Sequence, residues 1–235
     1  MNGYTAPIQD MRFLLESVVG LDAVRALPGY EEATPDLLEA VLEEAGKLAS
    51  QVLAPLNQPG DRQGSRIENG VVRTPEGWAA AYAKFVEGGW PSVPFDTEHG
   101  GQGLPWAVHT PLAEMWSSAN LAFSLCPMLS VGAAEVLAVH GTAAQKSLYL
   151  TPLVEGRWTG TMNLTEPQAG SDLGQIRTRA VREGGHYRVT GQKIYITYGE
   201  HDIAENIVHL VLARLPDAPA GVRGISLFIV PKRVV

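Results

Sequence analysis

The stretch RWTGTMNLTEPQAGSD (residues 157–172) decides the fold class, because the period of the sequence changes within it. From Trp158 onward the residues alternate between two sides of an extended chain. Trp158, Gly160, Met162 and Leu164 fall on one side, and Thr159, Thr161, Asn163 and Thr165 fall on the other. A period of two predicts a half-buried β-strand. The strand is expected to end at the turn Glu166-Pro167, before a compact polar segment.

The residues before this stretch predict helices. Thr34 followed by Pro35 is a typical start, with a hydroxyl at the N-cap and proline in the first turn. Apolar residues then follow at helical spacing and define one wide face: Leu37, Leu38, Val41, Leu42, Ala45, Leu48, Ala49, Val52 and Leu53. Pro55 is expected to end this helix, because proline disrupts the hydrogen bonding of a helix interior. A loop rich in Gly, Asn and Asp is expected over residues 57–70.

Four more helices are expected farther along the chain. Thr74-Pro75 repeats the start signal, and an apolar stripe with helical spacing follows it. The glycine-rich segment EHGGQGLP (98–105) precedes the next helix. The apolar window LAFSLCPMLSVGAAEVLAV (121–139) forms another, and Thr142 is the candidate cap of the last.

The residues after the opening stretch predict strands. The segments that read as strands are TRAVR (178–182), HYRVTG (186–191), QKIYIT (192–197), NIVHLVLARL (206–215) and GISLFIV (224–230), with Gly184-Gly185 as a hairpin turn. Helices first and strands afterwards indicate an α+β protein with two segregated domains. We expect an N-terminal extension over 1–33, an all-α domain over 34–157 and a β-barrel-like domain over 158–235.

Composition and charge exclude several classes of protein. Eighteen Lys and Arg face 25 Asp and Glu, and no basic block occurs, so we do not expect nucleic-acid binding. Cys126 is the single cysteine, which fits a reducing compartment. The first residues lack the basic and apolar regions of a signal peptide, so we expect a cytoplasmic protein. The window 121–139 contains Pro127 and Glu135, and we interpret it as a buried helix, not a membrane span.

Residue types near the opening stretch suggest a ligand. If 192–197 is a strand beside the first one, Thr165, Tyr195 and Thr197 share a face with hydroxyls and one aromatic ring. Such a face suits a flat heteroaromatic cofactor, and the amides after Pro167 with the Ser171 hydroxyl suit a phosphate. A plain polar loop between two strands is the alternative, and spacing alone does not name the ligand.

Several longer motifs resemble one family. MNLTEPQAGSDLG (162–174), followed some twenty residues later by GQKIYIT (191–197), resembles the acyl-CoA dehydrogenases, FAD enzymes that desaturate acyl-CoA thioesters. HGTAAQKSLYLTPLVEG (140–156) is similar to the segment that leads into the family's middle domain. EHGGQGLP and the residues from His201 to Lys232 resemble the branch that includes 3-methylmercaptopropionate-CoA dehydrogenase. Asn163 stands where a small residue or cysteine is common, and Tyr195 where many members have tryptophan.

The resemblance implies a site for FAD. The residues that it assigns to the cofactor are Met162, Asn163, Leu164, Thr165, Gly170, Ser171, Tyr195, Ile196 and Thr197. Thr165 would bond the flavin edge, Tyr195 would cover the ring, and Thr197 would lie near N5. The Ser171 hydroxyl would bond the pyrophosphate, and its backbone would lie near the CoA chain of the substrate.

The resemblance also implies a reaction and partners. A carboxylate base removes the α-proton of the thioester while the β-hydride passes to the flavin, which an electron-transfer flavoprotein reoxidises. The family's catalytic glutamate lies in a C-terminal helical domain that we expect to be absent here, so no catalytic residue is assigned. The complete protein is expected to be a homodimer or homotetramer. A non-catalytic, flavin-binding interaction member of the same family is the alternative.

Other candidate sites fit a structural role better. The six histidines show no metal-ligand spacing, so we expect surface and cap histidines and no metal site. No Gly-x-Gly-x-x-Gly motif follows a predicted strand, so a Rossmann cofactor is not expected. Glu166 and Asp172 are candidate catalytic carboxylates by residue type, but the resemblance implies that they shape the loop that follows the first strand.

Overall fold

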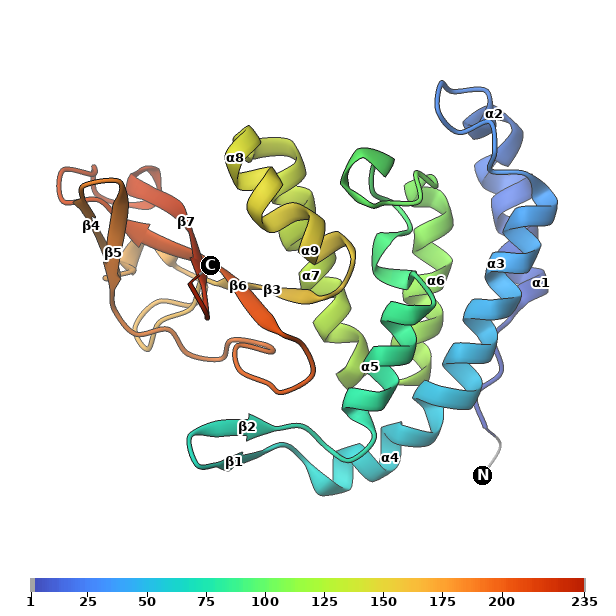
Figure 1. Cartoon of the computed structure of the whole chain (residues 1–235), viewed down its shortest axis with the longest axis horizontal. Helices are drawn as coiled ribbons and strands as arrows, with labels where there is room; N and C mark the ends of the chain where they lie inside the picture. Colours follow the sequence, from blue (N-terminus) through green and yellow to red (C-terminus); the bar gives the residue numbers. More distant parts are fainter. Residues whose placement is uncertain (1–2, 235) are drawn as a thin grey trace.

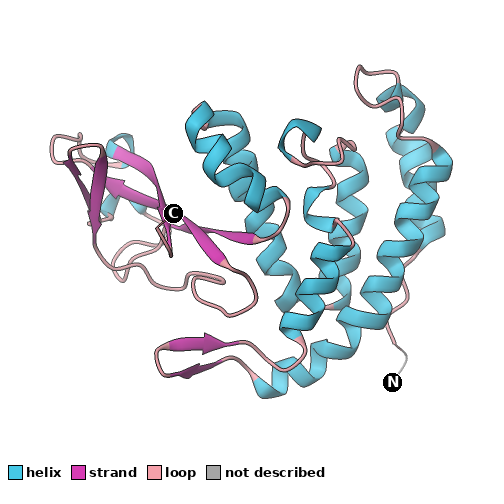
Figure 2. Ribbon diagram, in the orientation of Figure 1, coloured by secondary structure: helices cyan, strands magenta, loops and turns pink. Residues whose placement is uncertain are grey.

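The computed structural model describes residues 3–234, and it places helices first and a β-sheet last. Figure 1 shows the helices on one side of the molecule and the sheet on the other, with α7 and β3 where the two meet. Figure 2 shows the same division by element type, with a small hairpin at the lower edge of the view, below the loops of the sheet part. The predicted α+β class with segregated parts is confirmed.

The helical part contains nine α-helices and several short helical turns among the described residues. The α-helices are α1 (Ile8–Phe13), α2 (Leu21–Arg25), α3 (Pro35–Leu48), α4 (Ala54–Gln63), α5 (Trp78–Glu87), α6 (Trp106–Ala119), α7 (Leu121–His140), α8 (Ala143–Gln145) and α9 (Thr151–Val154). The turns between them are η1 (Leu14–Val19), η2 (Ala49–Leu53), η3 (Trp90–Ser92), η4 (Thr97–His99) and η5 (Lys146–Leu150).

Two predicted helix starts are confirmed in detail. The Thr34 hydroxyl accepts a hydrogen bond from the Leu37 amide at 3.3 Å, and Pro35 is the first residue of α3. The Thr142 hydroxyl accepts from the Gln145 amide, and the Gln145 side chain accepts from the Thr142 amide, which completes a capping box.

The predicted end of the first long helix is wrong. The chain stays helical through η2 and α4 as far as Gln63, although Pro55 lies in the first turn of α4. Hydrogen bonding changes from α to π in η2, just before Pro55, and a proline missing its N–H is tolerated where one helical segment gives way to the next. The predicted loop over 57–70 is therefore mostly helix and hairpin.

The hairpin pairs β1 (Arg66–Glu68) with β2 (Val71–Arg73) in antiparallel register. Its turn residues are Asn69 and Gly70, with φ of 53° and 78°. Both positive angles match the type I′ turn that favours Asn-Gly.

The helix start predicted at Thr74-Pro75 is also wrong. Helix α5 begins at Trp78, and the Thr74 hydroxyl instead donates to Asp202 at 2.7 Å.

The β part is a mixed five-stranded sheet with β6 at its centre. Its strands are β3 (Trp158–Asn163), β4 (Arg179–Glu183), β5 (His186–Thr190), β6 (Asn206–Arg214) and β7 (Ile225–Pro231). β6 runs parallel to β3 and antiparallel to β7, and it meets the β4–β5 hairpin at Arg214. Short 3₁₀ turns, η6 (Leu173–Gln175) and η7 (Val222–Gly224), lie in the loops. The hairpin turn predicted at Gly184-Gly185 is confirmed.

The strand predicted over 192–197 is wrong. Residues 191–196 belong to no strand, and Tyr195 has a φ of 57°. Tyr198, three residues later, has a φ of 51°. A positive φ breaks the alternation of side chains on which the prediction depended. The segment crosses the molecule as an ordered loop with its own fixed shape.

The helix α7 connects the two parts. By length and composition alone, this helix is long and apolar enough to cross a membrane. One side of α7 packs against β3, α6 and α9. On the remaining surface Leu121, Met128 and Val139 are exposed. The predicted buried helix is thus buried on one side.

Close packing of β3 on α7 depends on Gly160. A β-carbon at Gly160 would lie 2.4 Å from the Ala133 β-carbon, and the Gly160 amide donates to the Ser130 hydroxyl at 3.0 Å. A larger side chain must therefore push the sheet away from the helix.

Gly160→Val should lower the free energy of unfolding by about 1–3 kcal/mol, because overpacking a rigid contact has that cost. Urea denaturation of the 235-residue chain followed by circular dichroism measures the change. Gly185→Val is the control, since Gly185 lies in an exposed turn with no atom within 4 Å of an added β-carbon. Equal stability of the two variants would contradict the proposed packing role.

Candidate functional site

The two predicted cofactor segments lie side by side. The Ile194 amide donates to the Thr165 carbonyl oxygen at 3.0 Å, which joins the end of the β3 segment to the loop that contains Tyr195. Gly170 also approaches Thr165, because an added β-carbon would lie 3.8 Å from the Thr165 methyl group. The structure therefore brings the two sequence motifs together, although the second motif is a loop and not a strand.

The predicted side chains divide between two surfaces. Tyr195 is 88% exposed, and Gly170, Ser171 and Thr197 are exposed as well. Asn163 and Ile196 instead line a cavity of about 1140 Å³ between the segment 193–201, α4 and the β1–β2 hairpin. Tyr195 does not line this cavity, so Asn163 and Ile196 face a different space from the Tyr195 ring. The assignment of all nine residues to one cofactor remains a prediction.

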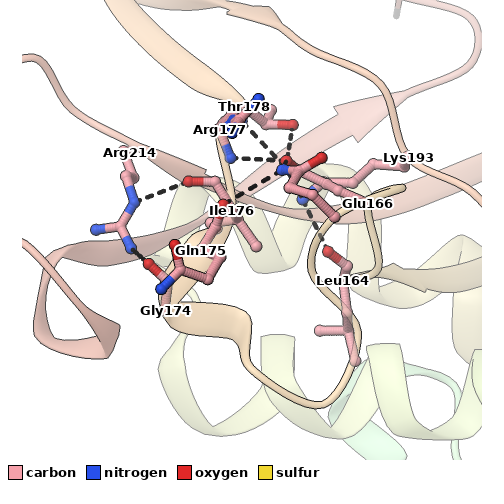
Figure 3. Close-up of polar contacts among 10 residues, drawn as sticks. Leu164, Glu166, Gly174, Gln175, Ile176, Arg177, Thr178, Lys193 and Arg214 are labelled. Carbon is pink, nitrogen blue, oxygen red and sulfur yellow. Dashed lines mark hydrogen bonds and ion pairs between the residues drawn. The ribbon is translucent and has the colours of Figure 1, made fainter.

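Glu166 is the centre of the polar network that shapes the loop, as Figure 3 shows. Its Oε1 accepts from the Thr178 amide at 3.0 Å, the Thr178 hydroxyl at 2.6 Å and Lys193 Nζ at 2.9 Å. Its Oε2 accepts from the Arg177 amide at 2.6 Å and from Gln168 Nε2 at 2.7 Å. Both carboxylate oxygens are thus fully engaged.

The ionised form of Glu166 is strongly favoured. Burial by itself raises the pKa of this carboxyl, but the donors from Lys193, Thr178 and Arg177 outweigh burial and lower the pKa to about 2. A carboxylate with such a low pKa and no free lone pair is a poor proton acceptor near pH 7. The structural role that was predicted for Glu166 is confirmed.

Lys193 fastens the two cofactor segments to each other. Its ammonium group donates to the Leu164 carbonyl oxygen at 2.9 Å as well as to Glu166. The ion pair is almost completely buried, with side-chain exposures of 9% for Lys193 and 3% for Glu166. A buried pair of this kind is sensitive to the loss of one partner, because the other charge is left uncompensated.

Arg214 holds the far end of the same loop, and sequence analysis did not single it out. Its Nε donates to the Ile176 carbonyl oxygen at 3.0 Å, and its Nη2 donates to the Gly174 carbonyl oxygen at 2.7 Å (Figure 3). Asp172 accepts from the Gly174 amide at 3.0 Å and caps η6, which confirms its predicted structural role. Strand β6 and the loop therefore form one hydrogen-bonded unit.

Tyr198 ties the Tyr195 loop to the helices. Its hydroxyl accepts from Trp78 Nε1 at 3.0 Å and donates to the Ala122 carbonyl oxygen at 2.8 Å. Burial raises the pKa of the Tyr198 phenol, so the hydroxyl keeps the proton that it donates. These bonds to α5 and α7 hold the loop in its unusual backbone conformation.

Two threonines of β3 pair with histidines. Thr159 Oγ1 lies 2.8 Å from His201 Nε2, and Thr161 Oγ1 lies 2.7 Å from His209 Nδ1. Burial, reinforced by the positive charge of Lys232, lowers the pKa of His201 to about 4, so this imidazole is neutral near pH 7. The expectation of surface and cap histidines is wrong for His201, which is buried.

The described residues contain no cluster of three or more His, Cys, Asp or Glu side chains arranged to hold a metal ion. Thr159 and Thr161, on the polar face of β3, are used for internal hydrogen bonds. Thr165, at the end of that face, is partly exposed. Of the threonines on the polar face of β3, therefore, only Thr165 at its end is placed to contact a ligand.

Comparison with known proteins matches both parts of the chain to one family. Residues 35–157 match the model "Acyl-CoA dehydrogenase, N-terminal domain", and residues 161–235 match "Acyl-CoA dehydrogenase, middle domain". The chain is 52% identical over 230 residues to a 3-methylmercaptopropionyl-CoA dehydrogenase of Ruegeria pomeroyi, which covers 97% of this chain and 39% of the relative. The chain thus spans about two fifths of the length of that curated relative.

Solved structures show the same similarity. Butyryl-CoA dehydrogenase from Megasphaera elsdenii superposes with a TM-score of 0.69 at 25% identity, covering 84% of this chain and 49% of that protein. A structure described as PigA with FAD and proline superposes with a TM-score of 0.64 at 25% identity, covering 83% of this chain and 48% of PigA. All of these proteins are about twice as long as the matched region, or longer.

Proposed function

Because the chain belongs to the acyl-CoA dehydrogenase family, we propose that the complete protein is an FAD-dependent acyl-CoA dehydrogenase. It would introduce a double bond between the α- and β-carbons of an acyl-CoA thioester. The observation that carries the proposal is the bond from the Ile194 amide to the Thr165 carbonyl oxygen, which sets the two family motifs side by side.

The residues present fit a flavin nucleotide. Tyr195 offers an exposed aromatic ring on a loop that hydrogen bonds hold in place, and a flat ring system is attracted to such a surface. Thr165 and Thr197 provide hydroxyls nearby in the same two segments. The exposed Gly170-Ser171 amides and the Ser171 hydroxyl are donors of the kind that bind a pyrophosphate. FAD carries both a flavin and a pyrophosphate, which favours it over FMN.

Each assigned residue has a proposed role in holding the cofactor. Thr165, Ser171, Tyr195 and Thr197 would contact FAD through their side chains, and Ser171 would also contact the CoA part of the substrate. The remaining assigned residues, which include Asn163 and Ile196, would contribute main-chain atoms. When bound, FAD supplies the acceptor for the hydride that leaves the substrate.

The chain's own contribution is to orient these groups. The pair of Glu166 and Lys193 fixes the spacing of the two segments, and Arg214 and Tyr198 fix the ends of their loops. With the two segments fixed in this way, any donor that faces the thioester oxygen would be held in position before charge develops on that oxygen. We assign the base that removes the α-proton to the part of the complete protein that its relatives have and this chain does not span.

The partners follow from the same proposal. The substrate is an acyl-CoA, and an electron-transfer flavoprotein takes up the electrons. The complete protein would act in fatty acid metabolism in the cytoplasm as a homodimer or homotetramer. Butyryl-CoA dehydrogenase and 3-methylmercaptopropionyl-CoA dehydrogenase among the similar proteins favour a short acyl chain.

The test uses the complete protein. We expect it to purify with FAD and to convert a short acyl-CoA to the 2-enoyl-CoA when an artificial electron acceptor is supplied. Thr197→Val should weaken FAD binding, as measured by the flavin absorbance retained after gel filtration, while the exposed Thr190→Val in β5 serves as the control. A colourless protein that takes up no FAD would overturn the proposal.

A further inference from the structure

The cavity between α4, the β1–β2 hairpin and residues 193–201 is a separate space from the proposed FAD surface. Its volume is about 1140 Å³, and the side chains that would contact FAD (Thr165, Ser171, Tyr195 and Thr197) do not line it. Sites for small organic ligands commonly occupy about 300–1,000 Å³. The cavity is therefore large enough for a ligand of its own.

One wall of this cavity is the face of the sheet where β3 pairs with β6. Thr161 and His209 are direct partners in the parallel register, and Asn163 follows Thr161 by two residues. The alternation of side chains along a strand therefore places all three on one face. Asn163 and His209 line the cavity, and Thr161, which is fully buried, contacts both of them.

The direction of these hydrogen bonds follows from counting protons. The Thr161 hydroxyl has one proton, which it donates to Asn163 Oδ1 at 2.6 Å. His209 Nδ1 lies 2.7 Å from the same hydroxyl oxygen, so Nδ1 carries the proton of that contact. Burial lowers the pKa of His209, which keeps the ring neutral near pH 7. In a neutral imidazole with a proton on Nδ1, Nε2 keeps a lone pair and is an acceptor.

His209 and Asn163 each keep a polar group free, unlike the neighbouring His201. His201 Nδ1 accepts from the Ile203 amide at 3.3 Å, and its Nε2 contacts Thr159 Oγ1, so both of its ring nitrogens are used. His209 Nε2 and the NH₂ group of Asn163 have no hydrogen-bond partner among residues 3–234. The cavity wall therefore offers one acceptor and one pair of donors.

The charges around the cavity disfavour an anion. Lys193 is paired with Glu166, and Glu200 is paired with Lys232. Asp61, on the α4 wall, is exposed and has no ion-pair partner in the described part of the chain. The uncompensated charge is therefore negative and would repel a phosphate or a carboxylate. A neutral ligand fits this wall better.

We propose that this cavity binds a neutral organic molecule through a primary carboxamide or a lactam. The N–H group of the ligand donates to His209 Nε2, and its carbonyl oxygen accepts from Asn163 Nδ2. In both ligand classes N–H and C=O lie on one edge, whereas a trans secondary amide directs them in opposite ways. The apolar part of the ligand lies against Val72, Pro75 and Ile196. The proposal does not depend on FAD binding or on the proposed reaction.

The tautomer of His209 gives the first test. Long-range ¹H–¹⁵N NMR spectra of the 235-residue chain show which ring nitrogen carries the proton, and His209→Gln identifies the His209 signals among the six histidines. We expect the proton on Nδ1 near pH 7. Thr161→Val removes the hydroxyl that accepts this proton, so it should lower the fraction of this tautomer. A proton on Nε2 in the parent chain would overturn the proposal, because the hydrogen bonds would then run in the opposite direction.

Three probes of nearly equal shape test the ligand class. Benzamide has an NH₂ group where acetophenone has a methyl group and benzoate has a charged oxygen. We expect benzamide to shift the His209 ring signals with millimolar saturation. Acetophenone and benzoate should bind at least about tenfold more weakly, because neither has the N–H donor. Acetophenone is less polar than benzamide, so binding by apolar contact alone would reverse this order. Equal or reversed affinities, or no saturable shift, would overturn the proposal.

An isosteric variant tests the donor on the protein. Asn163→Asp keeps the shape of the side chain and the acceptor for Thr161, but it removes the free N–H groups. It should weaken benzamide binding at least about tenfold, with the His209 signals as evidence that the sheet is folded. Asn69→Asp makes the same change of charge in the exposed hairpin turn, outside the cavity lining, and should leave binding unchanged. Full benzamide binding by Asn163→Asp would contradict the proposed contact.

Discussion

Glu166→Gln should lower the free energy of unfolding of the 235-residue chain by about 3–5 kcal/mol, because it breaks a buried ion pair and leaves Lys193 uncompensated. The amide group of glutamine also places a donor where Gln168 or Arg177 now donates to the carboxylate. Urea denaturation followed by circular dichroism measures the loss.

The control for this variant is Glu183→Gln. Glu183 pairs with Arg188 at 2.7 Å, but the two side chains are 41% and 68% exposed. Exposed pairs contribute about 0–1 kcal/mol, so this variant should be nearly neutral. Lys193→Met combined with Glu166→Gln should be less destabilising than the sum of the two single changes. A loss below about 1 kcal/mol for Glu166→Gln would contradict the stabilising role of the pair.

The same pair predicts a dependence of stability on acid. The folded protein lowers the pKa of Glu166 from 4.5 to about 2, so its contribution is fully present above pH 4.5 and is lost as the pH falls toward 2. A shift of this size corresponds to about 3 kcal/mol. The difference in stability between the parent chain and Glu166→Gln should therefore shrink over this range, and a constant difference from pH 6 to pH 2 would refute the assignment.

A protein made of residues 1–235 alone should oxidise acyl-CoA at least about 10²–10⁴-fold more slowly than the complete protein, which is the usual loss when a general base is missing. Within the loop that approaches the proposed cofactor, both carboxylates are already engaged. Glu166 has a pKa of about 2 and five donors, and Asp172 caps η6.

The comparison assays both proteins with butyryl-CoA or methylmercaptopropionyl-CoA and an artificial electron acceptor. Rates are divided by the amount of bound FAD, so that weak cofactor binding by the shorter chain is not mistaken for slow chemistry. Turnover near that of the complete protein would contradict the prediction. In that case Glu166→Gln in the shorter chain would be the first variant to assay, since it would remove the only buried carboxylate of the loop.

The sequence was most informative where hydrogen bonds are local. The caps at Thr34 and Thr142 bond residues three positions away, and both were predictable from residue type alone. The Asn69-Gly70 turn is equally local, and Asn-Gly is a standard hairpin signal, although the polar residues around it are also typical of a loop. At positions 69 and 70, asparagine and glycine are favoured because both residues adopt the positive φ angles of a tight hairpin turn.

The segment 191–197 could not be predicted because distant contacts decide its shape. Its alternating Ile194, Tyr195 and Ile196 are typical of a strand, and nothing nearby indicates the positive φ of Tyr195. The bonds that hold the loop come from Trp78 and Ala122, which are 120 and 76 residues from Tyr198 in the chain. For the site, the family motifs correctly identified two neighbouring segments, whereas Arg214 and the Thr–His pairs required the three-dimensional arrangement.

The contacts between the Tyr198 region and the helices also determine when this region can fold during synthesis of the chain. Thr74 donates to Asp202, 128 residues later, and Trp78 donates to Tyr198, 120 residues later. At ~5–20 residues per second, a ribosome needs about 6–26 s to add those 128 residues. Throughout that interval the Thr74 hydroxyl and the Trp78 indole are bonded only to solvent or to temporary partners. The Tyr195 loop therefore takes its final shape after the helices have emerged, and binding of the proposed cofactor to this loop follows that step.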